Sequence, residues 1–424
     1  MATRRFLLFF SAVFQLSLGK LDYVHAIFRG GDRSPSSVYP TDPNSIPGTW
    51  PNGWSQLTDR GQEEMKELGT FVKDRYVEEL KLINPVFDED QVFIRTTTKR
   101  RAAESARFFA ETLFPGQITS ISGDVPYWAD LLLRPSSVHC EQYNVLEHHL
   151  NKEFYKELHY RHKRLFGFLS QMTGWDVSMS NIGDVYSAFY RERIHGLPQP
   201  DWINETIYDT VVELKRIQIL SQYSNPILAK LRGGFLLGDV MKQISYIAER
   251  GNQPKLRVYS THDSTMNALM YNMGIAGDHM VPYAALLLLE IHQRTDGYRF
   301  LRVFYRNGTQ APLQQLSIAG CLFQDCPLNQ LKSLMETRMY KSKEELQEDC
   351  EGVEEKRKHV QENQYYVDET MKKAGVDEHQ SDQVVKVYGS RLTTILGVAT
   401  AILGAVILVQ AMCLFRAIGN DKIY

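Results

Sequence analysis

The sequence predicts an α/β fold, in which a mixed central sheet is flanked by helices and a smaller all-helical domain is inserted. Three observations support this prediction. In residues 20–135 and 246–340, short apolar runs typical of buried strands alternate with amphipathic helical segments. Between them, residues 136–245 are aromatic, histidine-rich and charged, with helical periodicity and no convincing strand. The chain has 424 residues and a formal net charge of −2, enough for a large core and without the basic bias of nucleic-acid binding.

The N-terminal end is predicted to be a signal peptide covering residues 1–19. Arg4 and Arg5 precede an apolar run at 6–18, and small residues follow in the positions that a signal peptidase needs. A buried N-terminal helix is the alternative interpretation. The order of charge, apolar run and small residues favours the signal peptide.

The C-terminal end is predicted to cross a membrane. Residues 391–416 are assigned to one transmembrane helix, because the segment 392–415 is uncharged and long enough for a hydrocarbon core of about 30 Å. A glycolipid-anchor signal is the alternative, but Arg416 and a polar tail follow the segment. Residues 341–390 then form a charged juxtamembrane stalk, and residues 417–424 form a short cytosolic tail.

These ends predict a single-pass type I membrane protein with a lumenal or extracellular ectodomain. Glycosylation sequons at Asn204 and Asn307 fit the secretory route. The tail does not decide between the lysosome and the cell surface, because Tyr424 is terminal.

Four elements are expected in the first α/β part. Apolar runs at 23–28 and 91–96 are typical of buried strands. Thr58 or Asp59 can cap a helix. The apolar stripe of that helix consists of Met65, Leu68, Val72 and Tyr76. An alanine-rich helix is expected at 100–114, where a Pro-Gly pair stops it.

The end of the insertion and the second α/β part contain a long helix, a strand and a hairpin. A helix is expected at 227–249, followed by a strand at 256–260. Ser264 is the expected cap of the next helix. Strands at 284–292 and 298–306 flank an Asp-Gly turn, which is a strong hairpin signal.

Four of the five cysteines lie in the predicted ectodomain, an even number that suits disulfides in an oxidising compartment. Three pairings are possible. Cys321 with Cys326 would close a short loop and leave Cys140 with Cys350. Cys413 falls in the predicted membrane helix, where we expect it to be free or acylated. The spacings lack the second close pair of a structural metal site, so no metal and no cofactor is predicted.

Side chains suited to phosphate follow three of the predicted strands. Arg29 and Arg33 bracket a glycine turn after the first strand, and Arg95 ends the second. His262 can donate a hydrogen bond to a phosphoryl oxygen, and Asp263 can pass a proton to a leaving alkoxide. A lone arginine or His-Asp pair is more often structural. Ligands bind at the carboxyl ends of strands in open α/β sheets, so the convergence predicts a site for phosphate or a phosphate monoester.

These motifs resemble those of the histidine acid phosphatases, in the branch of membrane-anchored lysosomal and secreted prostatic-type enzymes. The similarity runs over most of residues 22–350. It rests on Phe28-Arg29-Gly30-Gly31-Asp32-Arg33-Ser34-Pro35, Trp50-Pro51-Asn52-Gly53 before Gln56-Leu57-Thr58, Leu231-Arg232-Gly233-Gly234-Phe235-Leu236-Leu237, His262-Asp263, and Gly320-Cys321 through Cys326-Pro327-Leu328.

The resemblance implies a mixed α/β domain with a smaller helical domain, and phosphate monoester hydrolysis as the family reaction. The residues that match the phosphate-holding positions are Arg29, Arg33, Arg95 and His262, and Asp263 matches the proton donor. Gly30 stands where the family has its nucleophilic histidine. The resemblance also favours the Cys140–Cys350 and Cys321–Cys326 disulfides and includes homodimers.

The chain departs from the family pattern in two further places. Thr98 and Arg100 replace two acidic residues after Arg95, which makes the rim of the site more positive. A cysteine pair usual in the middle of the family is missing.

No histidine visibly replaces the missing nucleophile. His25 is five residues from Gly30 on an extended strand and alternates to the opposite face. His159 and His162 could share a helix face, but no carboxylate or cysteine partner for a metal is evident. We therefore expect a phosphate-binding protein of weak or absent activity, whose glycine leaves a void that a water could enter. The alternatives are a working acid phosphatase with an unusual nucleophile and a non-catalytic binding or adhesion module.

Overall fold

The structure is a computed structural model that describes residues 19–117, 119–250 and 254–351. The predicted membrane helix and tail, all but the last residue of the predicted signal peptide, and most of the predicted stalk lie outside the described residues. Within the described ranges, no helix has both the length and the apolar character needed to cross a membrane. All described residues belong to one compact unit.

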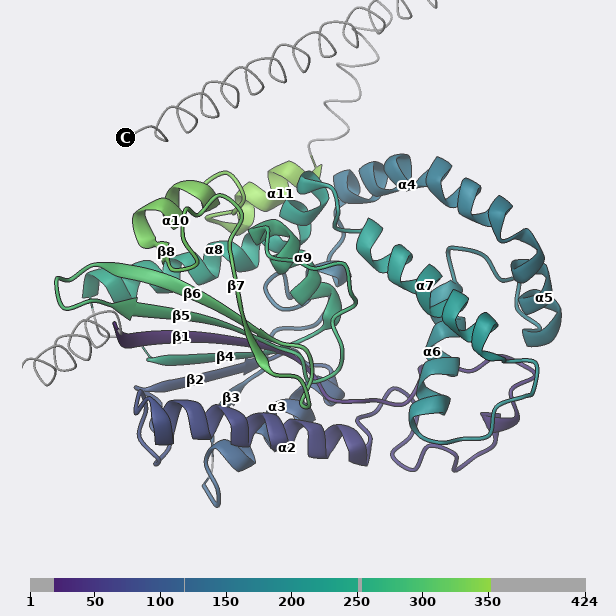
Figure 1. The fold of residues 1–424 in the computed structure, drawn as a ribbon, viewed down its shortest axis with the longest axis horizontal. Helices are drawn as coiled ribbons and strands as arrows, with labels where there is room; N and C mark the ends of the chain where they lie inside the picture. Colours follow the sequence, from purple (N-terminus) through teal and green to yellow (C-terminus); the bar gives the residue numbers. More distant parts are fainter. Residues whose placement is uncertain (1–18, 118, 251–253, 352–424) are drawn as a thin grey trace, which may run out of the picture. The chain divides into compact units, whose positions relative to one another are not determined.

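The described chain is built around a mixed sheet of eight strands, as predicted (Figure 1). The strands are β1 (Lys20–Arg29), β2 (Val92–Thr96), β3 (Ile121–Ser122), β4 (Leu256–Thr261), β5 (Leu286–Gln293), β6 (Arg299–Arg306), β7 (Leu313–Leu316) and β8 (Cys326–Pro327). Their order is β3-β2-β4-β1-β5-β6-β7, and β8 pairs with β6. Strands β1 to β4 run parallel, whereas β5 lies antiparallel to β1 and starts the predicted hairpin with β6.

Helices cover both faces of the sheet and form a separate helical part beside it (Figure 1). They are α2 (Asp59–Lys73), α3 (Arg100–Leu113), α4 (Glu141–Arg161), α5 (Lys163–Thr173), α6 (Ile182–Ile194), α7 (Glu205–Ser221), α8 (Pro226–Arg250), α9 (Asp263–Met273), α10 (Leu328–Met335) and α11 (Lys343–Glu351). Short turns complete them: η1 (Pro43–Ser45), η2 (Asp74–Glu79) and η3 (Pro135–Ser137).

The middle of strand β1 is mostly apolar, and both of its faces are buried. Val24, Ala26 and Phe28 pack into the core formed with α2 and α3. Tyr23 and Ile27 alternate to the other face and pack into the core formed with α8, α9 and α10. Because neither face of this central strand contacts water, both faces carry mostly apolar side chains.

Helix α2 begins where the sequence predicts. Thr58 is its N-cap, and its side chain accepts a hydrogen bond from the backbone N–H of Gly61. The predicted stripe of Met65, Leu68, Val72 and Tyr76 is fully buried against the sheet. At Gly69 a Cβ would lie 2.2 Å from the carbonyl oxygen of Phe109, so α2 and α3 pack backbone against backbone there. Glycine is required for so close an approach.

Helix α8 spans residue 245, where the sequence predicted the end of the helical insertion. Helix α8 packs on the sheet, and its Leu237, Val240 and Ile244 are buried in the same core as β1 and β5. The periodicity of α8 identified it correctly as a helix. It could not show which core the apolar stripe enters.

The helical part has a core of its own, which a segment of the α/β part enters. Tyr39, in the loop after β1, is fully buried there. Its ring contacts those of Phe189 and Trp202, with centroids 6.0 and 6.1 Å apart. The loop after β1 therefore holds the two parts together.

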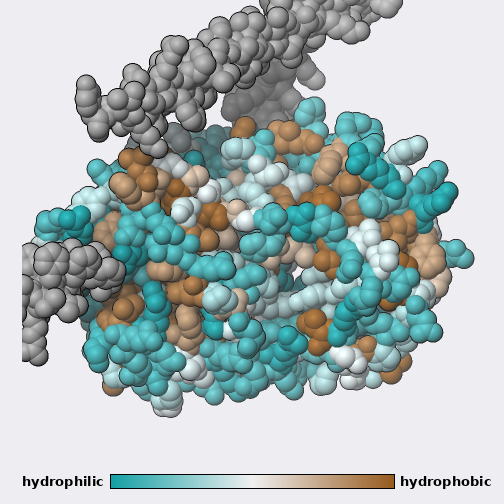
Figure 2. All heavy atoms as spheres, viewed as in Figure 1, coloured by the Kyte–Doolittle hydropathy of each residue, from teal (hydrophilic) through white to brown (hydrophobic). Residues whose placement is uncertain are grey.

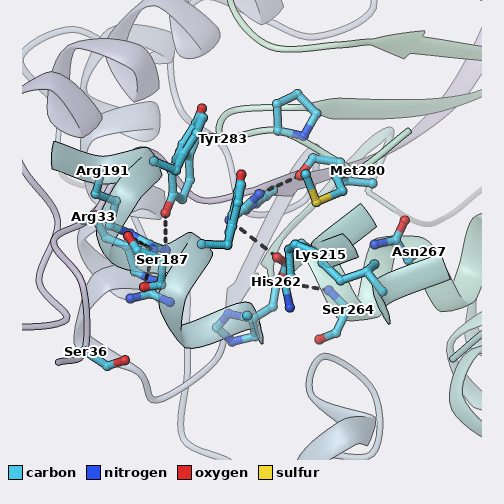
Figure 3. Close-up of a pocket in the computed structure, with 18 of the residues that line it drawn as sticks. Arg33, Ser36, Ser187, Arg191, Lys215, His262, Ser264, Asn267, Met280 and Tyr283 are labelled. Atoms are coloured by element: carbon cyan, nitrogen blue, oxygen red, sulfur yellow. Dashed lines mark hydrogen bonds and ion pairs between the residues drawn. The ribbon is translucent and has the colours of Figure 1, made fainter. Parts of the chain in front are cut away.

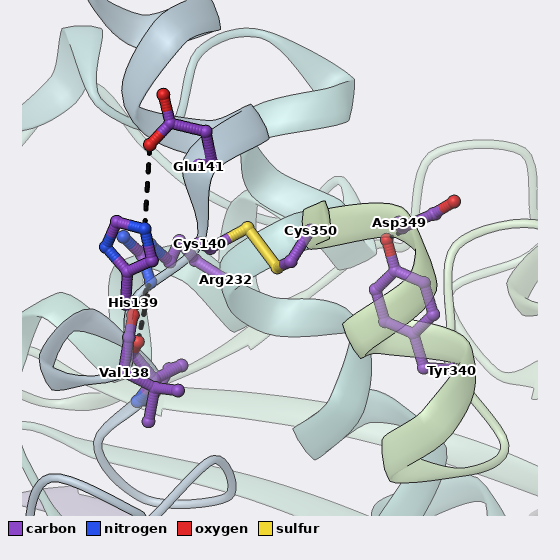
Figure 4. The surroundings of a disulfide bond; sticks show 9 residues. Val138, His139, Cys140, Glu141, Arg232, Tyr340, Asp349 and Cys350 are labelled. Atoms are coloured by element: carbon purple, nitrogen blue, oxygen red, sulfur yellow. Dashed lines mark hydrogen bonds and ion pairs between the residues drawn. A yellow bond between two sulfur atoms is a disulfide. The ribbon is translucent and has the colours of Figure 1, made fainter. Parts of the chain in front are cut away.

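Both disulfides have the pairing expected from the sequence. Cys140 at the start of α4 bonds to Cys350 in α11, with 4.7 Å between the two Cα atoms (Figure 4). Cys321 bonds to Cys326 and closes the short loop before α10. On the face seen in Figure 2, hydrophobic side chains are scattered among hydrophilic ones, as on most soluble domains.

Two buried carboxyl groups face each other where the loop after β1 meets α6. Glu192 is fully buried and Asp42 nearly so, and each has one carboxylate oxygen without a donor. The other oxygens accept hydrogen bonds, from Gln199 at 3.3 Å and from the N–H of Asn44 at 2.7 Å. Burial, and after it the neighbouring Asp42, raise the pKa of Glu192 to about 9, so the pair holds a proton at neutral pH.

We therefore expect Glu192 to make folding more stable in acid. Its pKa is raised in the folded state, so this contribution is complete below the unfolded pKa of about 4.3 and is lost as pH rises towards 9. Between pH 5 and pH 8.5 the free energy of unfolding of the parent should decrease. In Glu192→Gln, whose side chain does not titrate, this decrease should be smaller by at least about 1 kcal/mol. Urea unfolding at the two pH values measures this. Parallel pH profiles would contradict the shared proton.

Candidate anion-binding site

A cavity of about 670 Å³ lies where the carboxyl ends of β1 and β4 meet helices α6 and α7 (Figure 3). Its charged lining is mostly cationic. The cations are Arg29, Arg33, Arg101, Arg134, Arg191 and Lys215, and the carboxylates are Asp184, Asp209 and Asp263. Such an excess of positive charge, partly withdrawn from water, favours an anionic ligand.

The structure brings five of the predicted site residues together in this cavity: Arg29, Gly30, Arg33, His262 and Asp263. Strand pairing explains their meeting. β1 and β4 are parallel neighbours, and their last residues, Arg29 and Thr261, lie opposite each other. The segments that follow both strands therefore emerge at the same point of the sheet edge.

Arg95 does not lie in this cavity, contrary to expectation. Its guanidinium forms an ion pair with Asp130 at 3.0 Å, and both residues line a separate cavity. Arg95 precedes the last residue of β2, so its side chain is fixed by the strand rather than by the loop beyond it. The residue that reaches the site from this segment is Thr97, whose hydroxyl lies 3.2 Å from Nε2 of His262.

Arg101 and Arg134 line the cavity and were missed from the sequence. Arg101 is the second residue of α3, and no hydrogen bond or ion pair of its guanidinium occurs within the described residues. Burial lowers the pKa of Arg101, and the charge of Arg134 lowers it further. The sequence could have indicated Arg101, because it lies in the basic run that follows β2. Arg134 lies in an irregular loop, where no sequence pattern identifies it as a site residue.

His262 is held neutral as a hydrogen-bond acceptor at Nε2. Arg134 approaches this nitrogen at 3.4 Å, and a guanidinium can only donate. Burial lowers the pKa of His262 to about 3, and the positive charges of Arg134 and Arg101 contribute to the shift. The remaining proton is therefore on Nδ1 over the physiological pH range.

The carboxyl group of Asp263 is ionised at neutral pH. It lies 3.4 Å from Arg29 and accepts a hydrogen bond from the N–H of Ser264 at 2.9 Å. Burial raises its pKa, but Arg29 and Lys215 outweigh that effect and hold the pKa below its usual range. An anion on the same cations would offset their charge, and the carboxyl group would then take up a proton more readily. Asp263 begins α9 directly; His262, and not Ser264 as predicted, is the N-cap residue.

Arg191 braces the site from the helical part. It donates hydrogen bonds to the carbonyl oxygen of Arg33 at 2.9 Å and to the hydroxyl of Tyr283 at 2.6 Å (Figure 3). The Tyr283 ring stacks in turn on the guanidinium of Arg29, 4.0 Å from its centroid. Burial lowers the pKa of Arg33 to about 10, which still leaves it charged at neutral pH.

The space beside Gly30 is not the open void that the sequence led us to expect. A Cβ at this position would lie 2.8 Å from Oγ of Ser105. That hydroxyl accepts a hydrogen bond from the N–H of Gly31 at 3.3 Å and donates one to the carbonyl oxygen of Arg101 at 2.7 Å. Any larger residue at position 30 requires the serine hydroxyl to turn away, which a rotatable side chain can do.

The histidines considered as substitutes lie away from the cavity. His25 is fully buried in the core, and its Nδ1 lies 3.0 Å from the hydroxyl of Tyr23. His159 stacks on the ring of Phe166. In the described part of the chain, no three histidine, cysteine or acidic residues form a group that could hold a metal ion.

A model of the histidine phosphatase superfamily (branch 2) matches residues 20–306. Human prostatic acid phosphatase is 31% identical over 348 residues, covering 78% of this chain and 88% of that protein. Bovine lysosomal acid phosphatase is 29% identical over 364 residues, covering 79% and 85%. Among solved structures, the fold is similar to Hafnia alvei phytase in complex with myo-inositol hexakis sulphate. The TM-score is 0.63, with 17% identity and 76% and 98% of the two chains covered.

The position of Arg101 gives a direct test of the cavity. Arg101→Ala should weaken the binding of inorganic phosphate by about tenfold, because a charge-assisted hydrogen bond contributes about 1.5–3 kcal/mol. The matched control is Arg100→Ala, since Arg100 is exposed and paired with Glu104 on the same helix turn. Calorimetric titration measures both affinities. Equal losses in the two variants would mean that only net charge matters.

Proposed function

This chain belongs to the histidine phosphatase superfamily (branch 2), and from that premise we propose that its cavity binds phosphate or a phosphate monoester but hydrolyses the ester weakly or not at all. The observation that carries the proposal is the cluster of cationic side chains around a glycine. Arg29, Arg33 and Arg101 surround a position, residue 30, that offers no side chain to attack phosphorus.

The binding half of the proposal rests on guanidinium groups that have no carboxylate partner. Within the described residues the guanidinium of Arg101 forms no hydrogen bond or ion pair, and that of Arg33 donates only to the carbonyl oxygen of Ser34, at 3.0 Å. The carboxylate of Asp32 is directed elsewhere, to the hydroxyl of Thr58 and to Nε2 of His195, both at 2.6 Å. A phosphate would supply the oxygens that these arginines lack. His262 could donate its remaining proton, and Asp263 could protonate a leaving group.

The catalytic half rests on Gly30. A family reaction through a covalent phosphohistidine needs an imidazole at this position, by the resemblance to the acid phosphatases. Loss of a covalent nucleophile closes the two-step route. In subtilisin, removal of the nucleophile lowers turnover by about a millionfold, while binding contacts retain some catalysis. We expect a loss of similar order here.

Two other functions compete with this one. A working phosphatase could use a water in place of histidine, and Asp263 and His262 would serve it as they stand. Ser105 limits that route, since its hydroxyl lies 2.8 Å from where a Cβ of residue 30 would be and narrows the space for a water. A non-catalytic adhesion module is the other candidate; it would not require the cavity to bind phosphate.

We also propose that this domain is lumenal or extracellular and carried by a type I membrane protein. The two disulfides suit an oxidising compartment, and the lysosomal and prostatic relatives point the same way. Asn204 and Asn307 are exposed, as glycosylation requires. A homodimer, which the family resemblance includes, belongs to the same proposal, and sedimentation of the secreted domain tests it.

Restoring a histidine tests the proposed function. We expect Gly30→His to raise the hydrolysis of an aryl phosphate at acid pH by at least about a thousandfold over the parent. The double variant Gly30→His/Ser105→Ala removes the hydroxyl that the new side chain must displace, and Gly30→Ala serves as the control without an imidazole. Acid quenching with labelled substrate should trap phosphohistidine only in the two histidine variants.

The outcomes separate the three functions. Turnover in the parent equal to that of Gly30→His would establish a working phosphatase. Absence of phosphate or vanadate binding by calorimetry in the parent would favour the adhesion module.

A further inference from the structure

A second cavity, of about 560 Å³, lies apart from the anion-binding site. Helices α8 and α10, the loop at 125–132 and the segment at 339–343 form its walls. The two cavities share no lining residue. The volume lies within the range of natural small-molecule sites, roughly 300–1,000 Å³.

The floor of this second cavity is apolar. Leu131, Leu132 and Met241 are buried beneath it, and Phe235 and Met339 are partly buried. Methionine side chains are flexible and polarisable, so they fit an alkyl chain more readily than a rigid shape. An apolar hollow of this kind, left open to water, is typical of a binding site.

The charged lining of this cavity is mostly cationic, with five basic residues against the carboxylates of Asp130, Asp239 and Glu336. Lys242, Lys332 and Lys343 are exposed there, and none of them forms an ion pair with a carboxylate in the described part of the chain. The other two cations of the lining already have partners, because Arg95 pairs with Asp130 and Lys341 with Glu336. Lysine stems lie along apolar groups while their ammonium ends stay in water.

An apolar floor under ammonium groups that have no carboxylate partner matches a ligand that is apolar along its body and anionic at one end. We propose that this cavity binds a single-chain anionic amphiphile, such as a long-chain fatty acid. The chain would lie on Leu132, Met241 and Met339, and the anionic head would meet Lys242 and Lys332. This site is independent of the phosphate cavity and of the proposed function.

The test uses the ectodomain, whose described residues form one compact unit, and dodecanoate below its micellar concentration. We expect saturable binding at one site by calorimetry. Dodecyltrimethylammonium, which has the same chain with the opposite charge, should bind at least about tenfold more weakly. Inorganic phosphate should not displace dodecanoate, because the two cavities have no residue in common.

Variants locate the site. Lys242→Glu/Lys332→Glu should weaken dodecanoate binding by about tenfold or more. Lys152→Glu, on the exposed surface of α4, is the charge control and should have no effect. Met339→Trp should block binding by filling the cavity, and its melting temperature shows whether it folds. Unchanged affinity in the double lysine variant, equal binding of the cationic chain, or competition by phosphate would each overturn the proposal.

Discussion

The parallel pairing of β1 with β4 at the centre of the sheet is the constraint on which the site depends. Arg29 and Thr261 are aligned in register, so both following segments leave the sheet at one point. The turn after β1 can take its path only because Gly31 passes against Gly61, where a Cβ would lie 2.2 Å from a carbonyl oxygen. Backbone geometry therefore places the two motifs, and their side chains add the chemistry.

Bringing several arginines together in a partly buried site is unfavourable, because the charges lose water and repel one another. Burial is the first cause that lowers the pKa values of Arg33, Arg101 and Arg134, and neighbouring arginines lower those of Arg33 and Arg101 further. Asp263 offsets part of this charge through Arg29. Arg191 donates hydrogen bonds to Arg33, Ser187 and Tyr283. It therefore holds the wall of the cavity in place and has its donors occupied within the protein. The positive charges of the site repel one another, and a bound anion would reduce this repulsion.

The sequence predicted the features that depend on local pattern. Five of the strands (β1, β2, β4, β5 and β6), the Thr58 cap and both disulfides follow from apolar periodicity, capping chemistry, loop length and family resemblance. The predictions were wrong where the outcome depends on the direction in which a side chain points. Arg95 and Arg101 lie in one basic stretch, yet a strand directs the first to Asp130 and a helix turn carries the second into the cavity. Helix α8 shows the same limit, since periodicity reveals an apolar stripe but not its neighbour.

The bond between Cys140 and Cys350 joins positions 210 residues apart, so it encloses the helical part, β4 to β8 and the helices between them in one covalent ring. A protease that cuts a single peptide bond inside this ring would leave the pieces linked. Such clipped molecules would migrate as one species on a non-reducing gel and separate only after thiol treatment. Cleavage in the exposed loops of the helical part could therefore pass unnoticed in a secretory compartment, with the halves of the cavity still held together.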